Sequence, residues 1–286
     1  MDIKKLQNWF SMPVLNFWTW QIWWTTKKDL IDIEKQIEII KYSLANWICW
    51  IDTAEIYWMW WAEEIIWEAI KDYDRNKIFL ASKVMWNNCS YNAIIKACKN
   101  SLKRTKQKYF DLYYIHWREE KFPLEESMKA MSELVDMWLI KNIWVSNFWK
   151  KTLIEAQKYT NYKIVANQVH YNLIYREVEK DWLLDYCKEN DIMLVAYRPL
   201  ELWKLANSWN LSHMWLIEKY NKKASQISLN RLIKQKNVVT VFKSLNKEHI
   251  IDNLWSIWRN LDEQDVKYLR ESYKWQLYKS DCIELW

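Results

Sequence analysis

The chain has 286 residues, 42 basic and 36 acidic side chains, a net charge of +6, and 24 tryptophans but no glycine. The charges are interspersed and form no basic patch, so we expect no nucleic-acid partner. The most apolar stretch, residues 9–24, is interrupted by polar residues and is too short to span a bilayer, and residues 1–10 lack the apolar core of a signal peptide. We therefore expect a cytoplasmic protein without a membrane partner.

Short apolar runs rich in Val, Ile, Leu and Tyr alternate with longer segments of helical period. Strands are predicted at 16–20, 48–53, 77–83, 110–117, 140–147, 163–169, 192–197 and 238–242, and helices at 27–46, 91–106, 123–137 and 177–191 among others. Eight strand–helix units without a linker predict an α/β fold, a (β/α)8 TIM barrel, with residues 1–286 as a single domain. An open doubly wound sheet is the alternative.

Polar side chains close most of these predicted strands. They are Asp52, Lys83, His116, Ser146 with Asn147, Gln168, Tyr197, and Lys243 with Ser244. Active sites of such barrels form where the strands end and the βα loops begin. The set therefore predicts a site for a polar ligand, although any one of these residues alone would also suit an ordinary surface loop.

Tryptophan stands where glycine is expected. At the average frequency of about 7%, roughly 20 glycines would occur in a chain of this length. Trp47, Trp138 and Trp182 each follow an amphipathic run, at helix ends where a positive φ favours glycine. We interpret most tryptophans as occupying glycine positions of a parent sequence. The alternative, a naturally Trp-rich carbohydrate binder or interfacial membrane protein, would still keep glycines in its turns.

The segments "IDTAEIYW", "ASK", "DLYYIHW", "WVSNF", "NQVHYN" and "AYRPL" resemble those of the aldo-keto reductases, with Trp58 and Trp144 where that family has glycine. The resemblance covers nearly the whole chain. It implies an NAD(P)H-dependent oxidoreductase that reduces aldehydes or ketones to alcohols by hydride transfer. We expect a small-molecule carbonyl substrate, no metal, and a monomer or weak homo-oligomer.

The family's catalytic Asp, Tyr, Lys and His fall on Asp52, Tyr57, Lys83 and His116. The resemblance makes Tyr57 the general acid. A free tyrosine with a pKa near 10 is a poor acid at neutral pH, and a neighbouring ammonium such as that of Lys83 lowers this pKa. Asp52 would hold Lys83, and His116 would hydrogen-bond the carbonyl. Taken singly, the four residues could also be a helix cap, a rim residue, a strand end and a core histidine.

The resemblance also assigns cofactor contacts. The carboxamide of nicotinamide would be bound by Ser146, Asn147 and Gln168, and its ring would stack on Tyr197. Contacts at the adenosine end would come from Lys243 and Ser244 to the 2′-phosphate, and from Asn253 to the adenine.

His249 stands where many relatives have an arginine for the 2′-phosphate. A mostly neutral imidazole cannot offer a bidentate fork. We expect NADPH as the cofactor, with NADH possible. Trp20 and Trp117 would be walls of the substrate pocket and favour an apolar or aromatic aldehyde.

Two functional predictions remain: an NADPH-dependent carbonyl reductase, and a cofactor-binding regulatory or redox-sensing barrel with little turnover. Both belong to the glycine-bearing parent. A bulky residue at a left-handed turn costs on the order of 1 kcal/mol or more. Some twenty such changes would exceed a net stability of roughly 5–15 kcal/mol. The sequence therefore predicts that the chain as it stands does not fold to a stable, active barrel.

Overall fold

A computed structural model describes residues 2–20, 30–57, 60–180, 182–206 and 211–273. It confirms the predicted (β/α)8 class, because eight strands form a closed barrel in the order β10-β3-β4-β5-β6-β7-β8-β9. Each strand overlaps one of the eight apolar runs, with ends that differ by at most two residues. Their bounds are β3 Leu15–Trp18, β4 Trp50–Asp52, β5 Phe79–Val84, β6 Phe110–Ile115, β7 Ile140–Ser146, β8 Ile164–His170, β9 Met193–Tyr197 and β10 Val238–Phe242.

Helices follow the strands, as the alternating pattern predicts. Their bounds are α1 Leu30–Ala45, α2 Trp61–Ile70, α3 Tyr91–Arg104, α4 Leu124–Asp136, α5 Lys150–Lys158, α6 Glu177–Lys180, α7 Leu183–Glu189, α8 Leu211–Tyr220, α9 Ala224–Ile233, α10 Lys247–Leu254 and α11 Glu263–Ser272. The single helix predicted over 177–191 is wrong. Two helices, α6 and α7, occupy this range, and Trp182 at the N-cap of α7 has a left-handed backbone that interrupts the helical path. The first three residues of the helix predicted over 27–46 lie outside the described residues.

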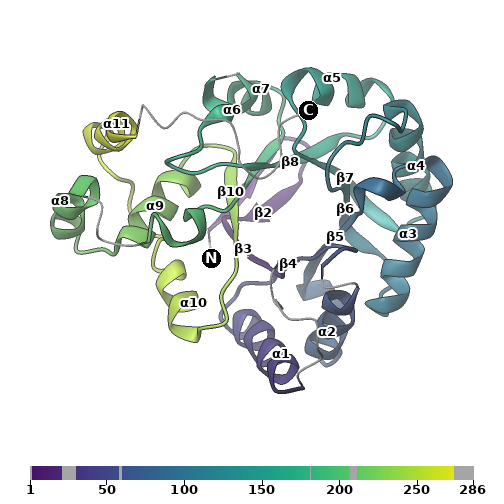
Figure 1. Cartoon of the computed structure of the whole chain (residues 1–286), viewed down its shortest axis with the longest axis horizontal. Coiled ribbons are helices and arrows are strands. Elements are labelled where there is room, and N and C mark those ends of the chain that lie inside the picture. The colour runs from purple at the N-terminus through teal and green to yellow at the C-terminus, as the bar shows by residue number, and fades with distance from the viewer. Residues whose placement is uncertain (1, 21–29, 58–59, 181, 207–210, 274–286) are drawn as a thin grey trace. The chain divides into compact units, whose positions relative to one another are not determined.

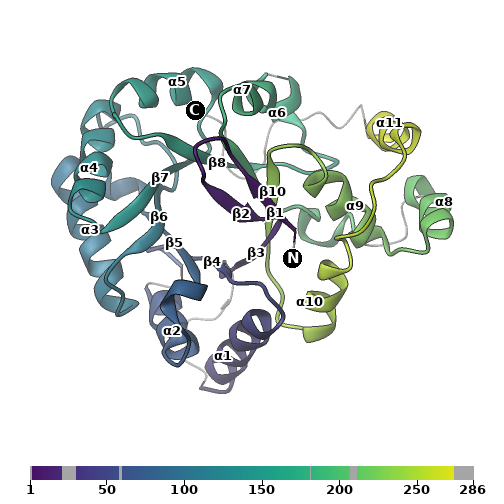
Figure 2. The same ribbon diagram turned by 180° about the vertical axis from the view of Figure 1, so that it is seen from behind.

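Contacts group the chain into two compact units, the first of which comprises Asn16–Asn167 and Lys243–Leu245. In Figures 1 and 2 helices α1 to α5 of this unit follow one another along the outer side of β4 to β7. Adjacent strands pair in parallel. Asp52 is in register with Ala81, and Lys83 is in register with Tyr114. Polar residues at the carboxyl ends of these strands therefore lie at the same end of the barrel.

The second unit comprises Met1–Leu15, Gln168–Phe242 and Asn246–Leu285. It contains an antiparallel hairpin that the sequence did not predict, β1 Ile3–Lys5 and β2 Ser11–Pro13, which lies beside β10 in Figure 2. The Lys4 ammonium donates to the carbonyl oxygens of Gln235 and Val238. Burial lowers the pKa of Lys4 to about 7. An apolar cluster lies among α8, α9 and α11 and includes Leu216, Ile227 and Leu269.

Five of the described tryptophans have a left-handed backbone. Their φ angles are 71° at Trp9, 68° at Trp47, 78° at Trp60, 59° at Trp138 and 60° at Trp182. Their exposed fractions are 78%, 77%, 50%, 85% and 66% in the same order. Glycine adopts such angles without a Cβ clash. An exposed indole contributes little burial energy that would offset this clash. The three helix-end tryptophans singled out in the sequence are all among these five.

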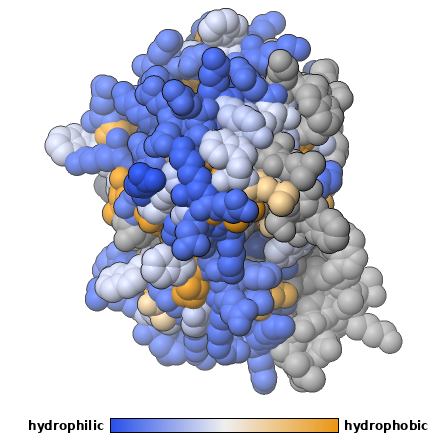
Figure 3. Space-filling model, turned by 90° about the vertical axis from the view of Figure 1, so that its left-hand side faces the viewer, coloured by the Kyte–Doolittle hydropathy of each residue, from blue (hydrophilic) through white to orange (hydrophobic). Residues whose placement is uncertain are grey.

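Hydrophilic residues predominate on the face of the molecule in Figure 3, where apolar residues form small scattered groups. Among the residues that the structure describes, none of the helices combines the length and the apolar character needed to cross a membrane.

Candidate active site

A buried ion pair lies at the carboxyl ends of β4 and β5. Asp52 and Lys83 have no solvent exposure, and the Lys83 ammonium contacts Oδ1 of Asp52 and donates to the carbonyl oxygen of Thr53 at 2.7 Å. Burial lowers the pKa of Lys83 to about 8, against the opposing effect of the Asp52 carboxylate. The lysine is therefore held in one place as a cation whose proton is more easily lost than that of a solvated lysine.

Tyr57 follows β4 and places its ring against this cation. Nζ of Lys83 lies 4.4 Å from the centroid of the Tyr57 ring. The His116 ring meets the Tyr57 ring edge-on, with centroids 5.7 Å apart. The structure therefore brings together all four predicted catalytic residues, Asp52, Tyr57, Lys83 and His116, within the first unit.

His116 directly follows β6 and is partly buried. Burial lowers the pKa of His116 well below its usual value, and the Lys83 ammonium lowers it further. The imidazole is therefore neutral at neutral pH and carries one N–H donor. Its Nδ1 is buried without a hydrogen-bond partner among the described residues. The neutral imidazole, with its one N–H donor, suits a group that hydrogen-bonds a carbonyl oxygen.

Tyr114 is a site residue that the sequence analysis missed. Its hydroxyl donates to Oδ2 of Asp52 at 2.7 Å, so that the two carboxylate oxygens serve Tyr114 and Lys83 separately. Its ring stacks on Trp144 with centroids 4.3 Å apart. The period of two in a strand would have revealed it, because Tyr114 precedes His116 by two residues and therefore shares its face.

Trp18, at the end of β3, is the second residue that was missed. Its Nε1–H donates to the phenolic oxygen of Tyr57 at 2.8 Å. It also stacks on Trp20, with centroids 4.8 Å apart. Trp117 is the other predicted pocket wall. Its ring centroid lies 4.9 Å from that of His116, and its ring stacks on Trp86. Trp20 is thus adjacent to Trp18, a partner of Tyr57, and Trp117 is adjacent to His116, a predicted catalytic residue.

The first unit also contains four of the predicted cofactor residues. Ser146 ends β7 and is buried, as is Asn147, whose backbone is left-handed with φ 59°. The Asn147 amide donates to the Ser146 hydroxyl at 3.1 Å and to the carbonyl oxygen of His116 at 3.2 Å. Lys243 and Ser244 directly follow β10. Burial lowers the pKa of Lys243, and the nearby Lys35 ammonium lowers it further.

The remaining predicted cofactor residues belong to the second unit. Gln168 in β8, Tyr197 at the end of β9 and Asn253 in α10 are buried. His249 in α10 is partly buried, and its ring meets Trp203 edge-on with centroids 5.2 Å apart.

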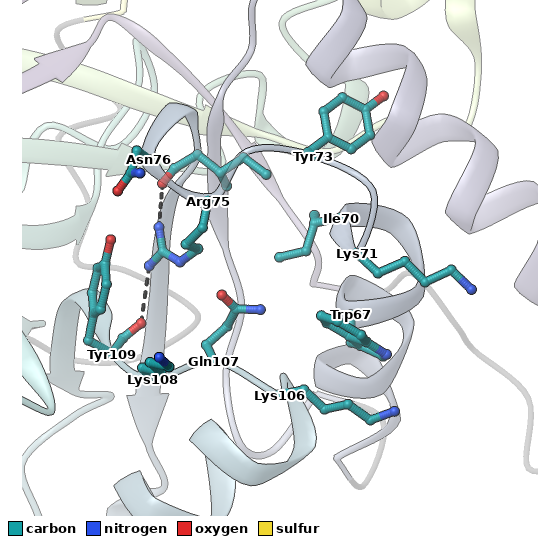
Figure 4. Close-up of a pocket in the computed structure, with 11 residues that line it drawn as sticks. Trp67, Ile70, Lys71, Tyr73, Arg75, Asn76, Lys106, Gln107, Lys108 and Tyr109 are labelled. Carbon is teal, nitrogen blue, oxygen red and sulfur yellow. Dashed lines mark hydrogen bonds between the residues drawn. The ribbon is translucent and has the colours of Figure 1, made fainter.

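A separate pocket of about 420 Å³ lies at the opposite ends of β5 and β6 (Figure 4). It is lined by Trp67, Arg75, Tyr109 and neighbouring residues, and none of the predicted site residues reaches it. The Arg75 guanidinium donates to the carbonyl oxygens of Ile78 and Tyr109, as the dashed lines in Figure 4 show, and pairs with Asp111 at 2.7 Å. Arg75 is therefore committed to joining the amino ends of the strands.

Comparisons with known proteins agree with this geometry. The sequence profile of the Aldo/keto reductase family matches residues 17–274. The glyoxal reductase of Bacillus subtilis (strain 168) is 32% identical over 267 residues, which cover 93% of this chain and 90% of that protein. A crystal structure of a thermostable aldo-keto reductase in complex with the inhibitor epalrestat has a TM-score of 0.91 and 35% identity, and the match covers 95% of this chain and 100% of that one. An aldo-keto reductase from Klebsiella pneumoniae in complex with NADPH has a TM-score of 0.84 and 26% identity, with 96% of each chain covered.

Proposed function

Because this chain belongs to the aldo-keto reductase family and is therefore an oxidoreductase, we propose that it reduces small aldehydes or ketones with NADPH and uses Tyr57 as the general acid. The observation that carries the proposal is the buried Lys83 ammonium, paired with Asp52, 4.4 Å from the centroid of the Tyr57 ring. A cation in this place favours negative charge on the phenolic oxygen as its proton leaves. The relative's name, glyoxal reductase, supports including small dicarbonyl compounds among the substrates.

When NADPH is bound, its nicotinamide supplies the hydride to the carbonyl carbon. The residues of this chain then orient and protonate the carbonyl oxygen of the substrate. Tyr57 donates its phenolic proton to the developing alkoxide, and Lys83 stabilises the charge that is left on Tyr57. Asp52 keeps Lys83 in place, and the Tyr114 hydroxyl fixes the second oxygen of Asp52. The neutral His116 donates a hydrogen bond that orients the carbonyl.

The donor set fits a phosphorylated dinucleotide. The Ser146 hydroxyl and the Asn147 amide are buried together at the end of β7, where hydroxyl and amide groups can pair with a carboxamide. Lys243 is half-buried, has Lys35 as a neighbouring cation, and forms no ion pair within the described part of the chain. Two ammonium groups without a carboxylate favour a phosphate between them. We therefore propose NADPH over NADH even though His249 replaces the usual arginine.

Assays of this proposal need a folded protein, and the chain as it stands is predicted to fold poorly. We define the five-glycine variant as the full chain with glycine at Trp9, Trp47, Trp60, Trp138 and Trp182. We propose that its functional behaviour represents that of the glycine-bearing parent.

The test measures NADPH binding and NADPH oxidation with a panel of aldehydes and dicarbonyls in the five-glycine variant. Adding Tyr57→Phe is expected to lower kcat by about 10²–10⁴-fold, the usual contribution of a general acid, and to leave the NADPH dissociation constant unchanged. Turnover that survives Tyr57→Phe contradicts the role of Tyr57. Tight NADPH binding without turnover on any carbonyl favours the regulatory or redox-sensing alternative.

A further inference from the structure

The ring of Tyr197 is covered on one face by a histidine that the proposed mechanism does not use. His170 ends β8 beside the end of β9, and its ring stacks on Tyr197 with centroids 5.3 Å apart and planes 13° apart. Tyr175 stacks on the same imidazole at 4.4 Å. The histidine therefore lies between two aromatic rings, one of which is Tyr197, the predicted nicotinamide platform.

A buried hydrogen-bond network fixes the position of His170. Its Nε2 lies 2.7 Å from Oε2 of Glu201, and the same carboxylate oxygen accepts from Nδ2 of Asn172 at 2.8 Å. Asn172 is in turn fixed to the backbone, because Nδ2 also donates to the carbonyl oxygen of Arg198 at 2.9 Å. The side chains of His170 and Glu201 are 2% and 1% exposed. The imidazole ring is therefore held by partners on two loops as well as by stacking.

The loop that supplies the carboxylate has an unusual backbone. Arg198, Glu201 and Leu202 have φ angles of 50°, 45° and 61°. Three non-glycine residues with positive φ in five positions are rare and carry a steric cost, and such strain persists where the surroundings over-determine it. Burying a carboxylate adds a desolvation cost. The strained backbone and the buried carboxylate therefore occur together at the point where Glu201 contacts His170.

We propose that His170, held by Glu201, is a positioning residue that presents Tyr197 to the nicotinamide. The imidazole stacks against one face of the Tyr197 ring, and the network that holds the imidazole sets the position and tilt of that ring. This inference rests on the proposed function, in which Tyr197 stacks on nicotinamide. Small displacements of such a platform matter because hydride transfer depends steeply on the position of the donor carbon.

The test is a double-mutant cycle in the five-glycine variant. The double substitution His170→Leu with Glu201→Leu removes both partners together, so that no unpaired carboxylate is left in the interior. It is combined with Tyr197→Leu, which removes the platform. The readouts are the dissociation constant of NADPH, measured by fluorescence titration, and the deuterium isotope effect on kcat with NADPH labelled at the transferred hydrogen.

With Tyr197 present, removal of the His170–Glu201 pair is expected to weaken NADPH binding about three- to ten-fold, the range of an aromatic contact, and to change the isotope effect. With leucine at position 197, the same removal should change neither quantity. Tyr220→Phe removes another buried hydrogen bond of the second unit, from Tyr220 to Asp265, and should leave NADPH binding unaltered.

The outcomes separate the two proposals. If the five-glycine variant does not bind NADPH, or if Tyr197→Leu has no effect on binding, the proposed function of this site fails. If Tyr197→Leu weakens binding but loss of the pair does not, only the inference is overturned. Equal effects of losing the pair in both backgrounds also overturn it, because they place the role outside Tyr197. If the variant without the pair loses its folded structure, Glu201→Gln gives the decisive comparison. Glu201→Gln keeps the side-chain volume and one oxygen acceptor. It must still weaken NADPH binding when Tyr197 is present and have no effect when leucine is at position 197.

Discussion

Replacing the five left-handed tryptophans with glycine is expected to raise the free energy of unfolding by about 5 kcal/mol. An L-residue with a Cβ costs roughly 1–2 kcal/mol in the left-handed region. Glycine removes this cost but gives back about 0.4–1 kcal/mol, because it has more freedom in the unfolded chain. The net gain is on the order of 1 kcal/mol at each position. Five separate surface positions without shared contacts should contribute nearly additively.

The indoles contribute little that would offset this gain. The least exposed, Trp60, still has 50% of its surface in solvent, and the most exposed, Trp138, has 85%. The Lys5 ammonium lies 4.1 Å from the Trp9 ring centroid, a contact worth about 0.5–1 kcal/mol at an exposed site. Loss of that contact makes Trp9 the position with the smallest expected gain.

Urea denaturation and thermal melts of the original chain and the five-glycine variant measure the effect. At about 2–4 °C per kcal/mol, the predicted gain corresponds to a rise in Tm of roughly 10–20 °C. We expect one cooperative transition in the variant, since residues 1–286 are proposed to form a single domain.

Trp255→Gly is the matched control. Trp255 is 61% exposed but has a right-handed backbone with φ −68° at the end of α10. Glycine there relieves no strain and should lower stability by roughly 0.5–1 kcal/mol. The reasoning from backbone strain is refuted if the five left-handed sites and Trp255 respond alike. The predicted instability of the original chain is wrong if that chain itself melts cooperatively and reduces aldehydes.

Four further predictions concern buried charges and hydroxyls. Tyr114→Phe removes a hydroxyl that donates to Asp52, the carboxylate paired with Lys83, and steady-state kinetics should show kcat reduced by about 3–10-fold, the contribution of one hydrogen bond. Because the pKa of Lys83 is lowered to about 8, its ammonium is present below pH 8 and is lost above it. The kcat should therefore fall as pH rises through about 8. A kcat that does not change over this range contradicts the role of the ammonium. For stability the sign is opposite, because the unfolded lysine keeps its proton to higher pH and the folded state is favoured as pH rises from 8 towards 10.5. Arg104→Met leaves the fully buried carboxylate of Glu63 without its 2.6 Å partner and should cost about 3–5 kcal/mol in urea denaturation, whereas Lys129→Met, in an exposed pair, should cost less than about 1 kcal/mol.

The strands and most helices could be predicted because their apolar periodicity directly reflects which side chains are buried. The hairpin of β1 and β2 escaped because each strand has three residues, too few to show a period of two, and the second ends at Pro13. The break between α6 and α7 escaped because its signal would have been a glycine, and Trp182 stands there instead. Most positions of left-handed backbone therefore could not be predicted from this sequence, because it has no glycines to mark them.

The proximity of Asp52, Tyr57, Lys83 and His116 could be predicted because these residues lie within short motifs at strand ends. Tyr114 follows from strand alternation once His116 is placed. The pairing of His170 with Glu201 could not be predicted, because it joins the end of β8 to a loop 31 residues further along that contains three left-handed residues. No periodicity encodes a contact of that kind.

The contact of Lys4 with the start of β10 has a consequence for how the chain is assembled during synthesis. The acceptors at Gln235 and Val238 are 231 and 234 residues further along. A ribosome must therefore release most of the polypeptide before the first hairpin can dock, and until then Met12, which is fully buried in the folded protein, remains accessible to other chains. We expect nascent fragments that end before Gln235 to depend on chaperones.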